Sequence, residues 1–84
     1  MYYVITFPTT HQALKFEKAL KYHQISGKLV PVPRKLSSNC GLAGKLETRA
    51  LLDQALEMCD SDGVDYEGAF IIFSDRQQAP EAIC

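Results

Sequence analysis

The chain has 84 residues, a length that supports one hydrophobic core but would leave two halves too small to fold separately. Its 9 Lys and Arg residues against 10 Asp and Glu residues are scattered along the sequence, which gives no basic stripe for binding nucleic acid. We therefore expect one α+β domain over residues 1–74 and a flexible polar tail over residues 75–84.

The opening apolar run, Tyr2 to Phe7, ends at Pro8 and is too short for a signal peptide or a membrane span. The cysteines Cys40, Cys59 and Cys84 are odd in number and widely spaced, which matches neither a disulfide framework nor paired zinc ligands. These features favour a reducing compartment. We expect a cytoplasmic protein that has no membrane contact, cofactor or metal.

The first half of the chain predicts a strand, a helix and a second strand. Residues 2–7 are aromatic and β-branched, and Thr9 with Gln12 forms a capping-box pattern that begins a helix. This helix ends near Gln24, and Gly27 is expected to take the left-handed conformation that closes it. Its apolar side has helical spacing: Ala13, Phe16, Ala19, Leu20 and His23. Residues 28–33 form an extended run whose two prolines belong on an edge strand.

The second half repeats this pattern after a polar connection over residues 34–39. Residues 40–46 form a third short strand, and Thr48 is expected to cap a second helix that stops in the run Asp60 to Gly63. Residues 64–74 supply the last strand, in which apolar side chains alternate on both faces. That strand is therefore expected to be covered on both sides.

The order strand, helix, strand, strand, helix, strand predicts a ferredoxin-like split βαβ fold, an antiparallel sheet with two helices on one face. The second strand then lies at an edge, where its prolines are tolerated. The other sheet face is uncovered in a monomer. Tyr2 or Tyr3, together with Tyr66 and Phe70, could make that face a homodimer or partner surface.

The candidate site centres on Cys40, which precedes Gly41 and follows two serines and the cations Arg34 and Lys35. Cations and hydrogen-bond donors favour the thiolate, which is the nucleophile, so Arg34, Ser38 and the N–H of Gly41 are candidates for stabilising it. The alternative is that Cys40 fills a small space at the start of a strand, since free cysteine is among the most buried residue types.

Three segments of the chain carry a family resemblance. They are Thr9-Thr10-His11 with Ala13-Leu14, then Val30 to Arg34, and finally Ser37 to Leu42. On these motifs the chain resembles a family of small selenium/sulfur carrier-like domains. The resemblance implies that Cys40 carries sulfur or selenium as a persulfide or perselenide and passes it from a donor protein to an acceptor protein. It gives no role to Cys59 or Cys84.

The remaining candidates have both functional and structural interpretations. Cys59 falls on the apolar face of the second helix and is expected to be buried, whereas Cys84 is either a resolving thiol or simply a terminal residue. His11 is either a base or ligand near the loop or a solvated residue, and His23 is expected to pack on the apolar side of its helix. The acidic residues around Gly63 lack the ligand order of a calcium loop.

Two functions follow from these observations. The first is a sulfur or selenium relay on Cys40, a carrier more than a turnover enzyme, because no phosphate loop, nucleophile elbow or paired-cysteine metal motif is present in the sequence. The second is a noncatalytic binding or oligomerisation module, in which residues 31–44 or the open sheet face contact a partner or small effector. Exposure of Cys40 distinguishes the two.

Overall fold

The computed structural model describes residues 1–36, 40–74 and 78–83. Its elements are β1 (Tyr2–Thr6), α1 (Thr10–His23), β2 (Lys28–Pro31), β3 (Leu42–Leu46), α2 (Arg49–Asp62), β4 (Gly68–Ile72) and β5 (Glu81–Ala82). The strands form one sheet in the order β2-β3-β1-β4-β5, and every neighbouring pair is antiparallel.

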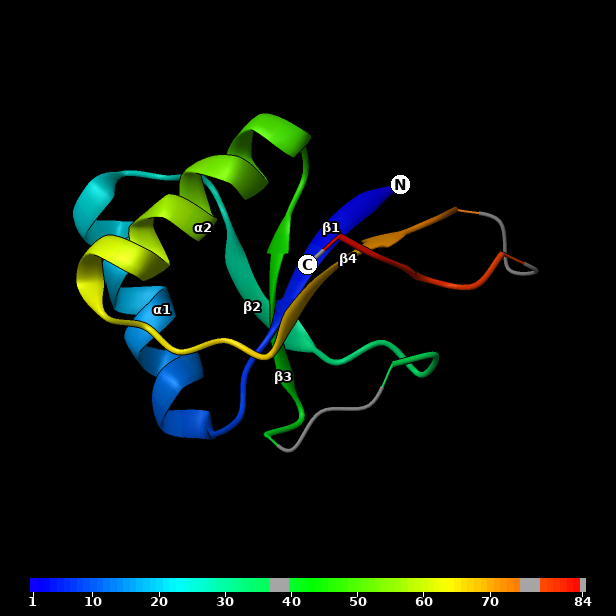
Figure 1. The fold of residues 1–84 in the computed structure, drawn as a ribbon, viewed down its shortest axis with the longest axis horizontal. Helices are drawn as coiled ribbons and strands as arrows, with labels where there is room; N and C mark the ends of the chain where they lie inside the picture. Colours follow the sequence, from blue (N-terminus) through cyan, green and yellow to red (C-terminus); the bar gives the residue numbers. More distant parts are fainter. Residues whose placement is uncertain (37–39, 75–77, 84) are drawn as a thin grey trace.

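The first four strands have the order expected for the ferredoxin-like α+β fold, with both helices on one side of the sheet (Figure 1). β2 lies at one edge, as its prolines predict, because a residue without an N–H weakens a central ladder. Among the described residues, no helix combines the length and apolarity that a membrane span requires.

Helix α1 begins and ends where predicted, but a different residue takes the left-handed conformation at its end. The Thr9 hydroxyl accepts a hydrogen bond from the Gln12 N–H at 3.3 Å. The left-handed residue at the end of the helix is Gln24, with φ 57°, and not Gly27. Gly27 is needed for space, since a Cβ there would lie 2.9 Å from the Leu46 Cδ2 atom. The sequence analysis therefore located the end of α1 correctly but assigned the left-handed conformation to the wrong residue.

Helix α2 also begins at its predicted cap, where Thr48 accepts from the Leu51 N–H at 3.2 Å. It ends at Gly63, which has φ 69°. The next residue, Val64, donates its N–H to the Cys59 carbonyl at 2.9 Å and is buried in the core. Val64 therefore follows the end of α2 and is not part of a strand, and β4 begins at Gly68, later than the predicted residue 64.

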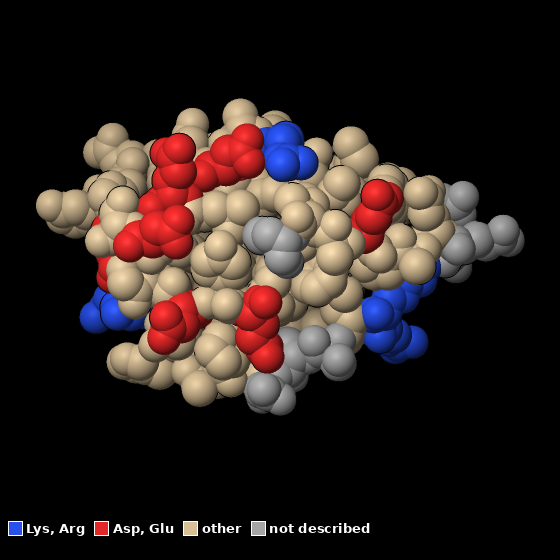
Figure 2. Space-filling view, in the orientation of Figure 1, with Lys and Arg blue, Asp and Glu red and all other residues tan. Residues whose placement is uncertain are grey.

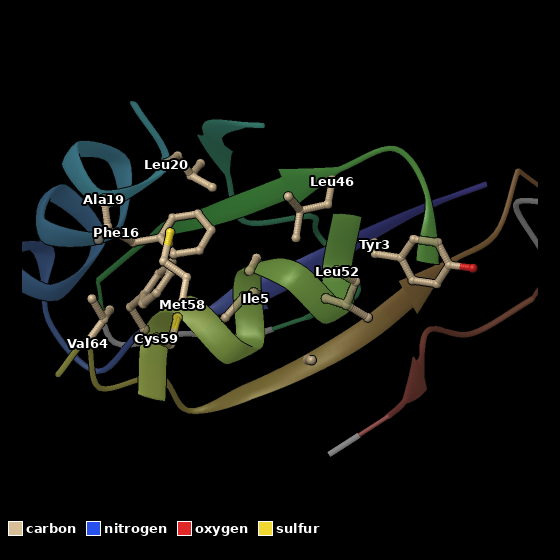
Figure 3. Close-up of a cluster of buried hydrophobic side chains, with 14 residues drawn as sticks. Tyr3, Ile5, Phe16, Ala19, Leu20, Leu46, Leu52, Met58, Cys59 and Val64 are labelled. Atoms are coloured by element: carbon tan, nitrogen blue, oxygen red, sulfur yellow. The ribbon is translucent and has the colours of Figure 1, made fainter. Parts of the chain in front are cut away.

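The core lies between the two helices and the sheet (Figure 3). The rings of Phe7 and Phe16 meet with centroids 5.0 Å apart, and both side chains are fully buried. Phe16 also lies against Gly44 of β3, where an added Cβ would be only 2.4 Å from the Phe16 Cε2 atom. The absence of a side chain at Gly44 thus lets α1 approach β3 closely.

The sheet face without helices is more enclosed than the sequence analysis expected. Val4 and Ala43 on this face have no exposed surface, and Thr6 is 2% exposed. The described residues of the β2–β3 connection and of the segment between β4 and β5 extend on the side away from the helices (Figure 1). Tyr3 is paired with Leu46 and belongs to the core cluster on the helix side, so it is not part of this face.

The C-terminal segment contains a strand that the sequence analysis did not predict. β5 pairs with β4, and the N–H of Ile83 donates to the Ala69 carbonyl at 2.7 Å. In the same segment, the Gln78 carbonyl accepts a hydrogen bond from the Lys35 Nζ atom at 3.2 Å. The segment therefore adds an edge to the sheet and contacts the β2–β3 connection.

Candidate functional site

Cys40 lies two residues before β3, where the chain enters the sheet from the β2–β3 connection. The N–H of Val32 donates to the Gly41 carbonyl at 3.0 Å, which continues the pairing of β2 and β3 beyond the last strand residues. Cys40 is therefore held at the end of the edge hairpin and not within the sheet, so β3 begins later than the predicted residue 40.

The Cys40 side chain is partly buried and packs against the margin of the core cluster. Its Sγ atom lies 3.1 Å from the Leu42 carbonyl oxygen, to which the thiol can donate, and 3.3 Å from the Leu42 nitrogen, whose N–H donates to sulfur. The Leu42 backbone thus offers an acceptor to the thiol and a donor to the thiolate.

Gly41 has a backbone conformation that favours glycine, with φ 75°. Among the described residues other than its chain neighbours Cys40 and Leu42, no atom lies within 4 Å of the position that a Cβ would occupy there, and the residue is exposed. The glycine is therefore explained by its dihedral angle and not by crowding.

The two cations of the predicted site, Arg34 and Lys35, are exposed and line a cavity of about 240 Å³. Its other lining residues are Pro33 from the β2–β3 connection, Ile72 at the end of β4, and the residues that follow β4: Phe73, Ser74, Gln78 and Pro80. The role predicted for Arg34 at the Cys40 sulfur stays a prediction. Ser38 lies outside the described residues, as does Cys84.

Cys59 provides the contrast to Cys40 within the same chain. It is 1% exposed on the core side of α2, close to Met58 and Val64 (Figure 3). Burial raises the pKa of the Cys59 thiol from 9.0 to about 12, with smaller contributions from Asp60 and Asp62. Cys59 is therefore a packing residue that stays protonated at neutral pH, as the sequence analysis expected.

Of the two histidines, His11 is exposed near the start of α1, and His23 differs from its predicted place on the apolar side of the helix. The His23 side chain is 37% exposed, and its Nε2 atom lies 3.0 Å from the Asp62 Oδ2 atom. It therefore connects the ends of the two helices. Within the described ranges, no three His, Cys, Asp or Glu residues are grouped so that they could hold a metal ion.

The sequence analysis did not predict two sets of hydrogen bonds to residues of the candidate site. The backbone of Leu42 contacts the Cys40 sulfur through both its N–H and its carbonyl, and residue type carries no signal of a main-chain contact. The contact between Lys35 and Gln78 joins residues 43 positions apart, which no local pattern predicts.

Comparison with known protein families gives a match over most of the chain. The profile of the family described as "Putative Se/S carrier protein-like" matches residues 2–71, which include β1 through most of β4 and all of the Cys40 region. Searches of curated proteins and of solved structures returned no match. Because the matched residues span most of the chain, this protein belongs to the Se/S carrier protein-like family.

Proposed function

We propose that this protein relays sulfur or selenium between a donor protein and an acceptor protein, with Cys40 as the covalent carrier. The family match supports the class of function. The observation that carries the proposal is the position of Cys40, a partly buried residue just before β3, next to the exposed Gly41. Cys59, by contrast, is enclosed by the core.

The relay consists of two thiol-exchange steps. The Cys40 thiolate attacks the outer sulfur of a donor protein's persulfide, which forms an S–S bond on Cys40 and releases the donor thiolate. An acceptor thiolate then attacks the outer sulfur of the Cys40 persulfide and releases the Cys40 thiolate. Each step breaks one S–S bond and forms another, so neither needs an external oxidant or reductant. A perselenide follows the same course.

Local contacts support both steps. The Leu42 N–H, 3.3 Å from the Cys40 sulfur, is a donor for the thiolate that attacks and for the thiolate that is later released. Arg34, Ser38 and the N–H of Gly41 are proposed to attract the anionic persulfide. A carrier thiol also needs a compartment that keeps it reduced, and we propose the cytoplasm.

Mass spectrometry of the intact native protein tests this proposal. After exposure to a small-molecule persulfide donor, the wild-type protein should gain one sulfur that a reductant removes, and peptide mapping should place it on Cys40. Cys40→Ser should lose this gain, whereas the matched variant Cys84→Ser should keep it. Equal gain in wild type and Cys40→Ser would reject Cys40 as the carrier.

A second candidate function is a binding module for a small effector, and the cavity beside Arg34 and Lys35 favours it. Its volume of about 240 Å³ is small, but its walls are mostly apolar with two cations alongside, which suits a compact organic anion. Under this function, Cys40→Ser would leave all activity intact. A homodimer is also proposed, and measuring the mass in solution tests it.

A further inference from the structure

The solvent-facing side of α1 carries an unusual set of side chains. In a helix that turns 100° per residue, six residues fall on the side opposite the buried positions of α1. All six are exposed, and we call them the α1 outer face: His11, Leu14, Lys15, Lys18, Lys21 and Tyr22.

Two of these residues are large apolar side chains that the core does not use. Leu14 is 50% exposed and Tyr22 is 82% exposed, and besides Met1 they are the exposed large hydrophobics among the described residues. They lie eight residues apart and so share one side of the helix. Helices normally turn such residues inward, and tyrosine is enriched where proteins contact one another.

The surface around these side chains is hollowed at two places. A depression of about 440 Å³ is lined by His11, Leu14, Lys15, Glu17 and Lys18. A second depression, of about 240 Å³, lies further along the helix and is lined by Lys15, Lys18, Ala19, Tyr22 and, from the end of α2, Asp62. Leu14 and Tyr22 therefore each border a recess that a side chain of another molecule can enter.

The charge of this face indicates what would bind there. Lys15, Lys18 and Lys21 lie on it, and the carboxylates of Glu17 and Asp62 lie at its margin. The outer side of α2 has the opposite sign, and Figure 2 shows acidic side chains gathered over that part of the molecule. Two copies joined through their α1 outer faces would place lysines against lysines. The α1 outer face is instead complementary to a surface that carries carboxylates around an apolar side chain.

The α1 outer face also begins at the end of the molecule where Cys40 lies. β1 leads into α1, and its last residue, Thr6, pairs with Ala43 near the start of β3. The start of α1 and the Cys40 region are therefore at the same end of the sheet (Figure 1). A partner that covers Leu14 is thus placed on the Cys40 end of the protein.

We propose that the α1 outer face docks an acidic partner protein, whose apolar side chains enter the recesses beside Leu14 and Tyr22. The proposal rests on the proposed relay in taking this partner to be the donor or the acceptor of sulfur. The lysines steer and orient the acidic surface, and the two apolar residues supply most of the affinity.

Nuclear magnetic resonance titration of the whole chain tests the docking surface. The probe is a synthetic helical peptide with leucines on one side and flanking glutamates, and the control peptide carries lysines in place of the glutamates. The acidic peptide should shift amide signals of α1, and the double variant Leu14→Ser with Tyr22→Ser should weaken its binding by about tenfold. Lys18→Glu should weaken binding at low salt and much less at high salt.

The results separate the two proposals. Sulfur loading of Cys40 from a small-molecule donor should be unchanged in the double variant, because no partner takes part. Loading without peptide binding at α1 would reject the docking surface alone, and peptide binding without loading would reject the relay alone. Equal binding of both peptides, or stronger binding to vesicles of anionic lipid than to the acidic peptide, would also overturn the docking proposal.

Discussion

Replacing Gly44 with alanine tests whether α1 and β3 are in direct contact. Gly44 lies within β3, and its added Cβ would be 2.4 Å from the Phe16 Cε2 atom and 2.8 Å from the Phe16 Cζ atom. Real Cβ atoms do not approach a ring this closely. Phe16 is fully buried and packs on Phe7, so its ring has little room to withdraw. The substitution should therefore separate the helix from the strand.

The sign of the stability change is informative. In a strand without crowding, replacing glycine with alanine stabilises a protein by about 0.5–1 kcal/mol, because glycine loses more backbone entropy on folding. Overpacking a core costs about 1–3 kcal/mol. At Gly44 the second effect exceeds the first, and we expect a net loss of about 1–2 kcal/mol in the free energy of unfolding.

Urea and thermal unfolding followed by circular dichroism measure this change. For a domain of this size, each kcal/mol lowers the melting temperature by about 4–8 °C. The matched variant is Phe16→Leu, which removes the ring that the new methyl group meets. If the clash is real, the double variant is destabilised by less than the sum of the two single variants.

Two results would refute the reasoning. A Gly44→Ala variant more stable than wild type would show that the ring is not against the strand. A double variant whose destabilisation equals the sum of the single variants would show that Gly44 and Phe16 do not interact.

Two further predictions concern the cysteine region and the core. Because burial raises the pKa of the Cys59 thiol from 9.0 to about 12, the folded state holds this proton more tightly than the unfolded state. Stability should therefore fall between pH 9 and pH 12, by up to about 1.4 kcal/mol per pH unit from this group, and Cys59→Ala should reduce that slope in urea titrations. An unchanged slope in Cys59→Ala would contradict the assignment. Gly41→Ala places alanine at φ 75°, so it should lose about 1 kcal/mol in denaturant unfolding. A loss near zero would show that the turn before β3 adopts another conformation.

The sequence correctly predicted the features that depend on a few neighbouring residues, such as the starts of the helices and the edge position of β2. Thr9 and Thr48 mark the starts of the two helices, because each side chain accepts from an N–H three residues later. The prolines of the second extended run correctly assigned β2 to an edge, because their missing N–H is a property of the residue itself. The order of the first four strands followed from these elements and from the handedness of their connections.

The predictions were wrong where contacts between distant parts of the chain determine the local structure. Gly27 is explained by its closeness to Leu46, so the residue that looked like a helix stop is a packing residue. The sequence analysis placed Val64 in the last strand. In the structure Val64 follows α2, where its N–H bonds to the Cys59 carbonyl and its side chain is buried in the core. The strand β5 depends on pairing with β4 and has too few residues to show a pattern of its own. The local sequence pattern likewise did not predict that Val4, on the sheet face without helices, is buried.

The candidate site combines a fixed backbone with an accessible side chain. The fully buried Ala43 and Leu46 anchor β3. Cys40 lies just before this anchored strand, where its sulfur contacts the Leu42 backbone and remains partly exposed. A carrier thiol needs this combination, because sulfur exchange requires access for a second thiolate and a position that two different partners can reach. Cys59 lies on a helix face covered by the sheet, so folding alone removes it from that chemistry.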